Sequence, residues 1–176
     1  MDAALLLGLI VLNGLFAMSE VALLTARKAR LRSQAAEGDR AAAAALALGE
    51  DPTRFLSTIQ IGITSIGILN GIVGQAAFAE PLARWMISLG LSKSSAEWLA
   101  TTLVVVLVTY VTILIGELVP KRLGQISAET VARLAARPMG LLSLISRPFV
   151  MALTGSTNLI LRSMGVDPDA VHKVTA

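Results

Sequence analysis

The 176-residue sequence contains no cysteine and only one histidine, His172. The absence of cysteine excludes disulfide bonds and thiolate metal sites, and His172 lies in a polar C-terminal tail where we do not expect a metal ligand. Charged residues are also scarce, at 15% of the chain against 55% for hydrophobic residues. The mean hydropathy of +0.72 indicates more apolar residues than a soluble domain of this size can bury in its core. The composition therefore indicates a membrane protein.

Three apolar segments are each close to the ~20 residues that a helix needs to cross a bilayer. They cover residues 3–25, 55–79 and 96–119. The third contains the run LATTLVVVLVTYVTILIG, whose β-branched residues would suit a strand in water, but a segment in lipid must satisfy its backbone groups internally and so forms a helix. The first lacks the basic start and the cleavage site of a secretory signal, so we interpret it as a retained helix. The sequence predicts an all-α membrane protein with three transmembrane helices.

Basic residues are concentrated on one side of these helices. The connection between the second and third helices carries two acidic and two basic residues, whose charges cancel. Because positively charged loops stay in the cytoplasm, we expect the N-terminus outside and the C-terminal part inside the cell. The pI of about 9.8 is then explained by basic residues on the cytoplasmic side, which face anionic lipid headgroups, and no nucleic-acid partner is needed to explain it. The basic flanking residues are Arg27, Lys28, Arg30, Arg32 and Arg40 after the first helix, and Lys121, Arg122, Arg133, Arg137 and Arg147 after the third.

The remaining segments predict short juxtamembrane helices on the cytoplasmic side. Residues 28–50 are rich in helix formers and are interrupted by Gly38. Residues 127–164 begin with a helix start at Ser127 and continue with an apolar face. The second apolar segment is expected to continue as a short amphipathic piece after Pro81.

The segment 139–166 has two readings. Arg147 and Pro148 divide it into pieces that are each too short to span a bilayer, so we expect helices in the cytoplasmic interface, the alternative being a fourth crossing. We predict one membrane domain over residues 1–165 and a linker or tail over 166–176.

Glu117 is the most informative polar residue, because it lies at the end of the third apolar segment in the stretch ILIGELVPKRLG. An ionisable group within a span costs roughly 2.5 to 3.5 kcal/mol on insertion scales and is a candidate for a site. Pro120 has no N–H, so the carbonyl of Gly116 loses its helical partner beside this carboxylate. Two hard oxygen donors suit Mg²⁺ or Na⁺. The alternative is that Glu117 reaches the interface or pairs with Lys121.

The second apolar segment contains the glycine-rich stretch QIGITSIGILNGIVG. Gly67 and Gly71 form a GxxxG motif, which most often means close helix packing or dimerisation, although this density of glycine also permits an unwound segment. Asn70 offers an amide oxygen at bilayer depth. Ser65 offers a hydroxyl, which could equally bond the carbonyl one turn back.

The first apolar segment carries Asn13, Ser19 and Glu20. Ser19 and Glu20 are adjacent and point about 100° apart on a helix, so we expect that one of them is a ligand and the other orients or pairs. Asn13 is expected only to contact a neighbouring helix. We predict a pocket of oxygen donors for a hard cation, from which the ion can also be released. Its predicted ligands are Ser19, Ser65, Asn70, the Gly116 carbonyl and Glu117.

Three stretches together resemble a known family. They are LNGLFAMSEVALLTARKARL, IQIGITSIGILNGIVGQ and GELVPKRLG. The combination is similar to the membrane domain shared by the CorB/CorC proteins of prokaryotes and the cyclin M (CNNM) proteins of animals, the bacterial CorC members most of all. The similarity runs from Leu12 to about Gly165, although family members vary at Asn70 and Gly71.

The resemblance implies a homodimer of three-helix membrane domains in the bacterial plasma (inner) membrane that exports Mg²⁺, with Na⁺ proposed as coupling ion. It also implies cytoplasmic CBS domains that bind ATP, which this sequence does not contain. The ion site of the family falls on Ser19, Ser65, Asn70, Gly116 and Glu117. A competing hypothesis is a dimeric membrane anchor that senses Mg²⁺ and regulates another transporter. We do not expect an enzyme, because the spans offer neither His nor Lys as a base for a serine nucleophile.

Overall fold

The computed structural model describes residues 2–50 and 52–165, and within these ranges the chain is helical with no strand. Three helices are long and apolar enough to cross a membrane, as predicted. The first is α1 (Asp2–Thr25), and the second lies within α4 (Pro52–Ser88). The third runs from Lys93 to Ile126 and is made of α5 (Lys93–Ile113), a π-helical segment η1 (Leu114–Leu118) and α6 (Val119–Ile126). The chain is therefore an integral membrane protein.

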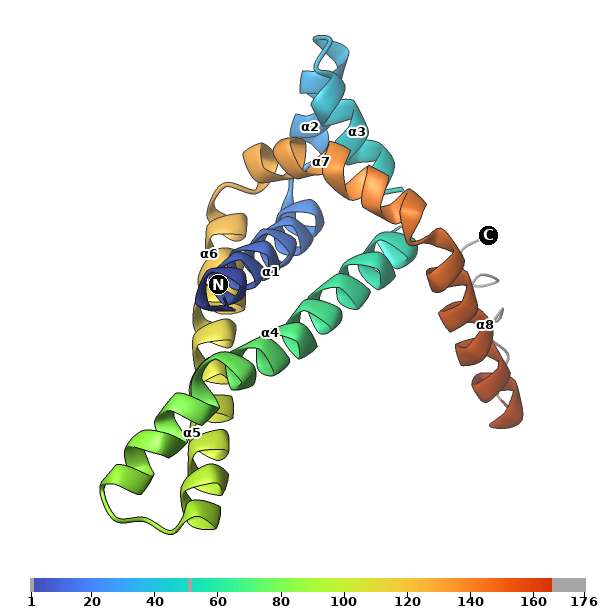
Figure 1. The fold of residues 1–176 in the computed structure, drawn as a ribbon. Coiled ribbons are helices and arrows are strands. Elements are labelled where there is room, and N and C mark those ends of the chain that lie inside the picture. Colours follow the sequence, from blue (N-terminus) through green and yellow to red (C-terminus); the bar gives the residue numbers. More distant parts are fainter. Residues whose placement is uncertain (1, 51, 166–176) are drawn as a thin grey trace.

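The second span belongs to one uninterrupted helix. It continues past Pro81 to Ser88, as expected from the sequence, because a proline removes one hydrogen bond and yet holds a helical φ. The glycine-rich stretch is also helical and not unwound. Figure 1 shows α4 as the long diagonal helix that turns back into α5 at its far end.

The GxxxG glycines do not pack against another helix in the described part of the chain. A Cβ atom built on Gly67 or Gly71 would meet nothing within 4 Å. The close approaches on α4 occur instead at Gly62, against the ring of Phe16, and at Gly74, against Val108. Of the two interpretations of the GxxxG motif, packing against another described helix of the same chain is not found, and dimerisation stays a prediction.

The helices α2 (Lys28–Ala36), α3 (Arg40–Leu48) and α7 (Ala128–Ile145) form a small bundle at one end of the spans, seen at the top of Figure 1. Gly38 adopts φ +97° and makes the turn between α2 and α3, where the sequence predicted a break. Alanine allows these helices to approach closely. The buried core of the bundle consists of Ala26, Leu31, Ala42, Ala45, Ala128, Ala132 and Ala136.

Asp39 joins α3 to α7. Its carboxylate caps α3 by accepting hydrogen bonds from the N–H groups of Ala41 at 2.8 Å and Ala42 at 3.2 Å, and it also pairs with Arg133 of α7. The hydrogen bond from Ala42 is the largest cause that lowers the pKa of Asp39, and Arg133 lowers it further. A carboxyl with a lowered pKa stabilises the folded state above its unfolded pKa and loses this contribution as the pH falls through the folded value.

We expect Asp39→Ala to lower the melting temperature by a few degrees, because it removes both the cap and the ion pair. Asp39→Asn keeps a good capping side chain and should lower it less. Since the difference between the wild type and Asp39→Asn comes from the charge, it should begin to shrink as the pH falls below about 4 and disappear as the pH falls through the lowered folded pKa. Thermal unfolding followed by circular dichroism measures both effects, with the exposed Glu37→Gln as the control in the same loop. A constant difference from pH 7 to pH 3 would contradict the assigned role of the charge.

The segment after α7 turns sharply. Helix α8 (Arg147–Ser163) follows at Ser146, and the two helices differ in direction by 65°. Together they are long and apolar enough to cross a membrane, so they form a fourth crossing only if the bent pair is one span. In Figure 1, α7 lies across the ends of the spans and α8 extends away from the other helices. The predicted tail over 166–176 lies outside the described residues.

Candidate functional site

The third span changes its helical geometry at the predicted position. Residues Leu114–Leu118 are π-helical, and the N–H of Val119 donates to the carbonyl of Leu114, five residues back. Pro120 follows directly and has no N–H to give to the carbonyl of Gly116. Single π-turns inside α-helices often occur at functional sites. The prediction that Pro120 disturbs the helix at Gly116 is confirmed, although the span is bulged rather than broken.

The freed carbonyl of Gly116 has a partner on α1. The side-chain amide of Asn13 donates to this oxygen over 3.0 Å in a buried contact. The two backbones are close, because a Cβ on Gly116 would lie 3.2 Å from the carbonyl oxygen of Ile10. A carbonyl oxygen has two lone pairs, so Gly116 can still accept a second bond or contact a cation.

A cavity of about 170 Å³ lies beside this contact, between α1, α4 and the third span. Several buried polar atoms on its wall have no hydrogen-bond partner in the described part of the chain: Oδ1 of Asn13, both side-chain polar atoms of Asn70 and Oγ1 of Thr112. Asn70 is only 1% exposed. A buried polar group without a partner costs roughly 1–3 kcal/mol, so these atoms indicate a polar occupant, either water or an ion. The lining residues are Asn13, Ile63, Gly67, Asn70, Gly71, Val108, Thr109, Thr112, Ile113 and Glu117.

Glu117 is the single carboxylate on the wall of this cavity. The other polar groups there are neutral amides and hydroxyls, which together with a carboxylate are the hard oxygen ligands that Mg²⁺ and Na⁺ accept. Within the described ranges, no three His, Cys, Asp or Glu side chains come together in a metal cluster. A cation in this cavity would therefore have mostly neutral ligands, and Glu117 would supply most of the attraction.

An ion-pair network joins Glu117 to the first helix. The ammonium of Lys121, one turn later, lies 2.7 Å from Glu117 and 3.6 Å from Glu20 of α1. Glu117 therefore pairs with Lys121, as the alternative prediction had it, and it also lies on the wall of the cavity. Glu20 takes part through Lys121 and does not line the cavity.

The five predicted ligands are only partly brought together. Asn70 and Glu117 line the cavity. Gly116 is not a lining residue, but its carbonyl accepts a hydrogen bond from Asn13, which is one. Ser19 is buried, but its hydroxyl donates to the carbonyl of Leu15 at 2.6 Å and it lines a different cavity between α1 and α7. Ser65 is exposed on α4 and is not among the lining residues.

Asn13 and Thr112 are wall residues that the sequence reasoning did not assign to the site. Thr112 precedes Gly116 by four residues and so lies one helical turn away on the same face. That spacing could have identified it. Asn13 was expected only to contact a neighbouring helix. It does so through Nδ2, which donates to the carbonyl of Gly116, while Oδ1 can still bind an occupant of the cavity.

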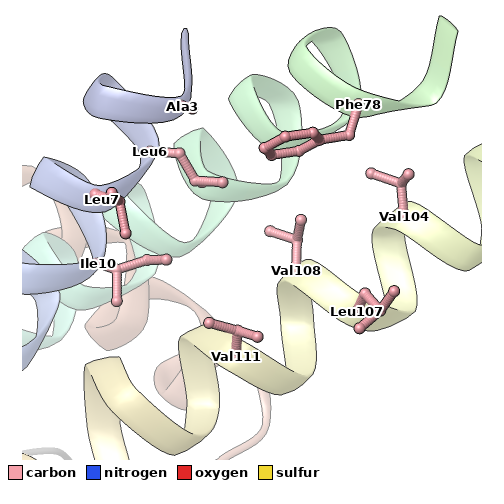
Figure 2. A pocket seen from close by; sticks show the side chains of 9 residues that line it. All are labelled: Ala3, Leu6, Leu7, Ile10, Phe78, Val104, Leu107, Val108 and Val111. Atoms are coloured by element: carbon pink, nitrogen blue, oxygen red, sulfur yellow. The ribbon is translucent and has the colours of Figure 1, made fainter. Parts of the chain in front are cut away.

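A second cavity among the same helices has a different character. It has a volume of about 340 Å³ and lies between the N-terminal half of α1, α4 and α5. Figure 2 shows that all of its labelled side chains are apolar, including Leu6, Phe78 and Val108. Hydrocarbon walls cannot replace the water around a cation, so this cavity is unsuited to an ion. The polar cavity at Asn70 and Glu117 is therefore the candidate site.

Comparison with known proteins gives a consistent result. The model of the family described as "Cyclin M transmembrane N-terminal domain" matches residues 4–176. The UPF0053 protein sll0260 of Synechocystis sp. is 41% identical over 167 residues, which are 95% of this chain and 37% of the relative. The polyamine export protein of Escherichia coli K12 is 37% identical over 157 residues, which are 89% of this chain and 35% of the relative.

A Bacillus subtilis relative, the UPF0053 protein YhdT, is 33% identical over 172 residues, which are 97% of this chain and 37% of the relative. The chain thus spans little more than a third of the length of these relatives. The match covers the first helix, the glycine-rich helix and the π-helical span alike. The resemblance stated from the sequence motifs is confirmed, and the chain belongs to the cyclin M transmembrane N-terminal domain family.

Proposed function

We propose that this chain is the membrane domain of a cation exporter, with Mg²⁺ as the cargo, and that it is not an enzyme. The observation that carries the proposal is the cavity whose wall includes the carboxylate of Glu117 and whose buried oxygen atoms on Asn13, Asn70 and Thr112 have no partner among the described residues. Mg²⁺ gives up its water reluctantly, so a transport site must replace part of its hydration shell with hard oxygen ligands. Na⁺ accepts the same ligands and is the proposed coupling ion.

The cavity volume is compatible with a partly hydrated ion. A water molecule takes about 30 Å³ in the liquid, so a cavity of about 170 Å³ holds an ion with several waters. Because Glu117 is the only carboxylate on the wall, we propose a weak site that can release its ion, as transport requires. Ser19 and Ser65 remain proposed ligands of an arrangement in which α1 and α4 have moved, since neither lines the cavity in this one.

A polyamine is the second candidate cargo. One relative is named a polyamine export protein. In this chain the ammonium of Lys121, which is chemically a primary alkylammonium, lies between Glu117 and Glu20 at 2.7 and 3.6 Å. The pair of carboxylates thus accepts the same group that a polyamine presents at each end.

Flux through sealed liposomes separates these functions. We expect purified protein to move Mg²⁺ down an imposed gradient, followed by a Mg²⁺-sensitive dye inside the vesicles, at a rate well above protein-free liposomes. Spermidine flux, followed with labelled spermidine, tests the second candidate in the same vesicles. Spermidine flux without Mg²⁺ flux would favour the polyamine, whereas Mg²⁺ binding without any flux would favour the sensor that regulates another transporter.

The assembly is proposed from the family alone. We propose a homodimer in the bacterial plasma membrane, with the N-terminus outside and the bundle of α2, α3 and α7 in the cytoplasm. The large apolar side chains exposed on α1, α4 and α5, such as Leu7, Ile72 and Val106, suit contact with lipid or with a second copy. CBS domains elsewhere in the full-length protein would act on the spans through α7, which packs on both α1 and α3.

A further inference from the structure

Three charged side chains from one corner of the molecule form a network beside the cavity. Lys121 of α6 lies between Glu117 of η1 and Glu20 of α1, with N–O distances of 2.7 and 3.6 Å. All three side chains are more than half covered, with exposed fractions of 31% for Lys121, 34% for Glu117 and 17% for Glu20. Because water screens such a network only partly, each charge strongly affects the others.

Glu117 belongs to this network and to the cavity at the same time. A cation that enters the cavity and the ammonium of Lys121 therefore compete for one carboxylate. An additional positive charge within about 4–6 Å of an ion site weakens cation binding substantially, as it lowers the affinity of a carboxylate for a proton. Lys121 must leave Glu117, at least in part, before the cargo can bind fully.

We propose that Lys121 is a tethered counter-cation that moves from Glu117 to Glu20 when the cargo binds and returns when the cargo leaves. This inference rests on the proposed function, since it assumes a cationic cargo at Glu117. Lys121 already contacts both carboxylates, so the exchange needs only a change of side-chain rotamer on a flexible four-carbon stem. The half-buried Glu117 is then never left without a positive partner, and the returning ammonium promotes release of the cargo.

Removing the ammonium should separate affinity from turnover. In the full chain, we expect Lys121→Met to tighten Mg²⁺ binding by on the order of tenfold, measured by isothermal titration calorimetry, because one competing charge is gone. Mg²⁺ flux through liposomes should nevertheless slow, since nothing displaces the ion. Lys121→Arg keeps the charge and should retain an affinity near that of the wild type. If Lys121 only holds α6 against α1, Lys121→Met should instead weaken binding or leave it unchanged, and the proposal would be overturned.

The role of Glu20 as the second partner is tested with a double-mutant cycle. Glu20→Gln removes the place to which Lys121 moves, so it should weaken Mg²⁺ binding by roughly tenfold while Lys121 is present. In the Lys121→Met background the same substitution removes only a neighbouring charge and should have a smaller effect. Equal effects in both backgrounds would show that Lys121 does not move to Glu20.

The outcomes also distinguish this inference from the proposed function. If the wild type binds and transports Mg²⁺ but Lys121→Met does not bind it more tightly, only the exchange is wrong. If the wild type binds no Mg²⁺ and Lys121→Met does, the counter-cation is supported as an inhibitor of binding. If neither protein binds Mg²⁺, the cargo assignment and the exchange both fail.

Discussion

Replacing Glu117 with glutamine is expected to reduce Mg²⁺ flux to the level of protein-free liposomes. Glutamine keeps the size of the side chain and removes the only carboxylate on the wall of the cavity. A neighbouring charge changes the affinity of an ion site by about 10- to 1,000-fold, so the remaining amides and hydroxyls should bind Mg²⁺ too weakly for transport. Calorimetry measures the loss of binding, and vesicle flux measures the loss of transport.

Glu97→Gln is the matched control for this experiment. Glu97 lies on the same span and also pairs with a lysine four residues away, Lys93, at 4.0 Å. It is exposed at the opposite end of the helix and does not line the cavity at Asn70. Glu97→Gln should therefore transport like the wild type. Normal flux from Glu117→Gln, with a folded protein by circular dichroism, would refute the assignment of Glu117 as the central ligand.

The sequence predicted the part of the site that depends on local chemistry. Pro120 lacks an N–H whatever its surroundings, so the disturbance at Gly116 followed from the order of residues alone. The three spans were likewise predictable, because lipid leaves a long apolar segment few alternatives to a helix. Glu117 was predicted as a site residue because an ionisable group is costly within a membrane span, and in the structure it lies on the wall of the candidate cavity.

The sequence could not predict which polar side chains face one another across helices. Ser19 satisfies its hydroxyl on the carbonyl of Leu15 within its own helix, and Ser65 lies on an exposed face. The rotation of each helix about its axis decides this, and that rotation depends on packing against the other two helices. Asn13 enters the site because α1 contacts the π-helical segment closely, which no local pattern encodes.

The close contact between α1 and the third span depends on small residues at several points. A Cβ on Gly14 would lie 3.0 Å from the ring of Pro120, and one on Gly124 would lie 2.5 Å from the carbonyl oxygen of Met18. The second approach involves backbone on both sides, so no side-chain rotation can relieve it. The same interface holds the hydrogen bond between Asn13 and Gly116 that forms one edge of the cavity.

Gly124→Ala is accordingly expected to be the most destabilising of the conservative substitutions in the spans. The added methyl group forces α6 away from α1, and such overpacking typically costs about 1–3 kcal/mol. The shift should also stretch the contact between Asn13 and Gly116, so we expect weaker Mg²⁺ binding together with a lower melting temperature. Gly8→Ala is the control, because a Cβ at Gly8 on α1 meets nothing within 4 Å. Equal melting temperatures for the two variants would show that α6 does not pack on α1 at Met18, and would remove the structural support for the position of Gly116 beside the cavity.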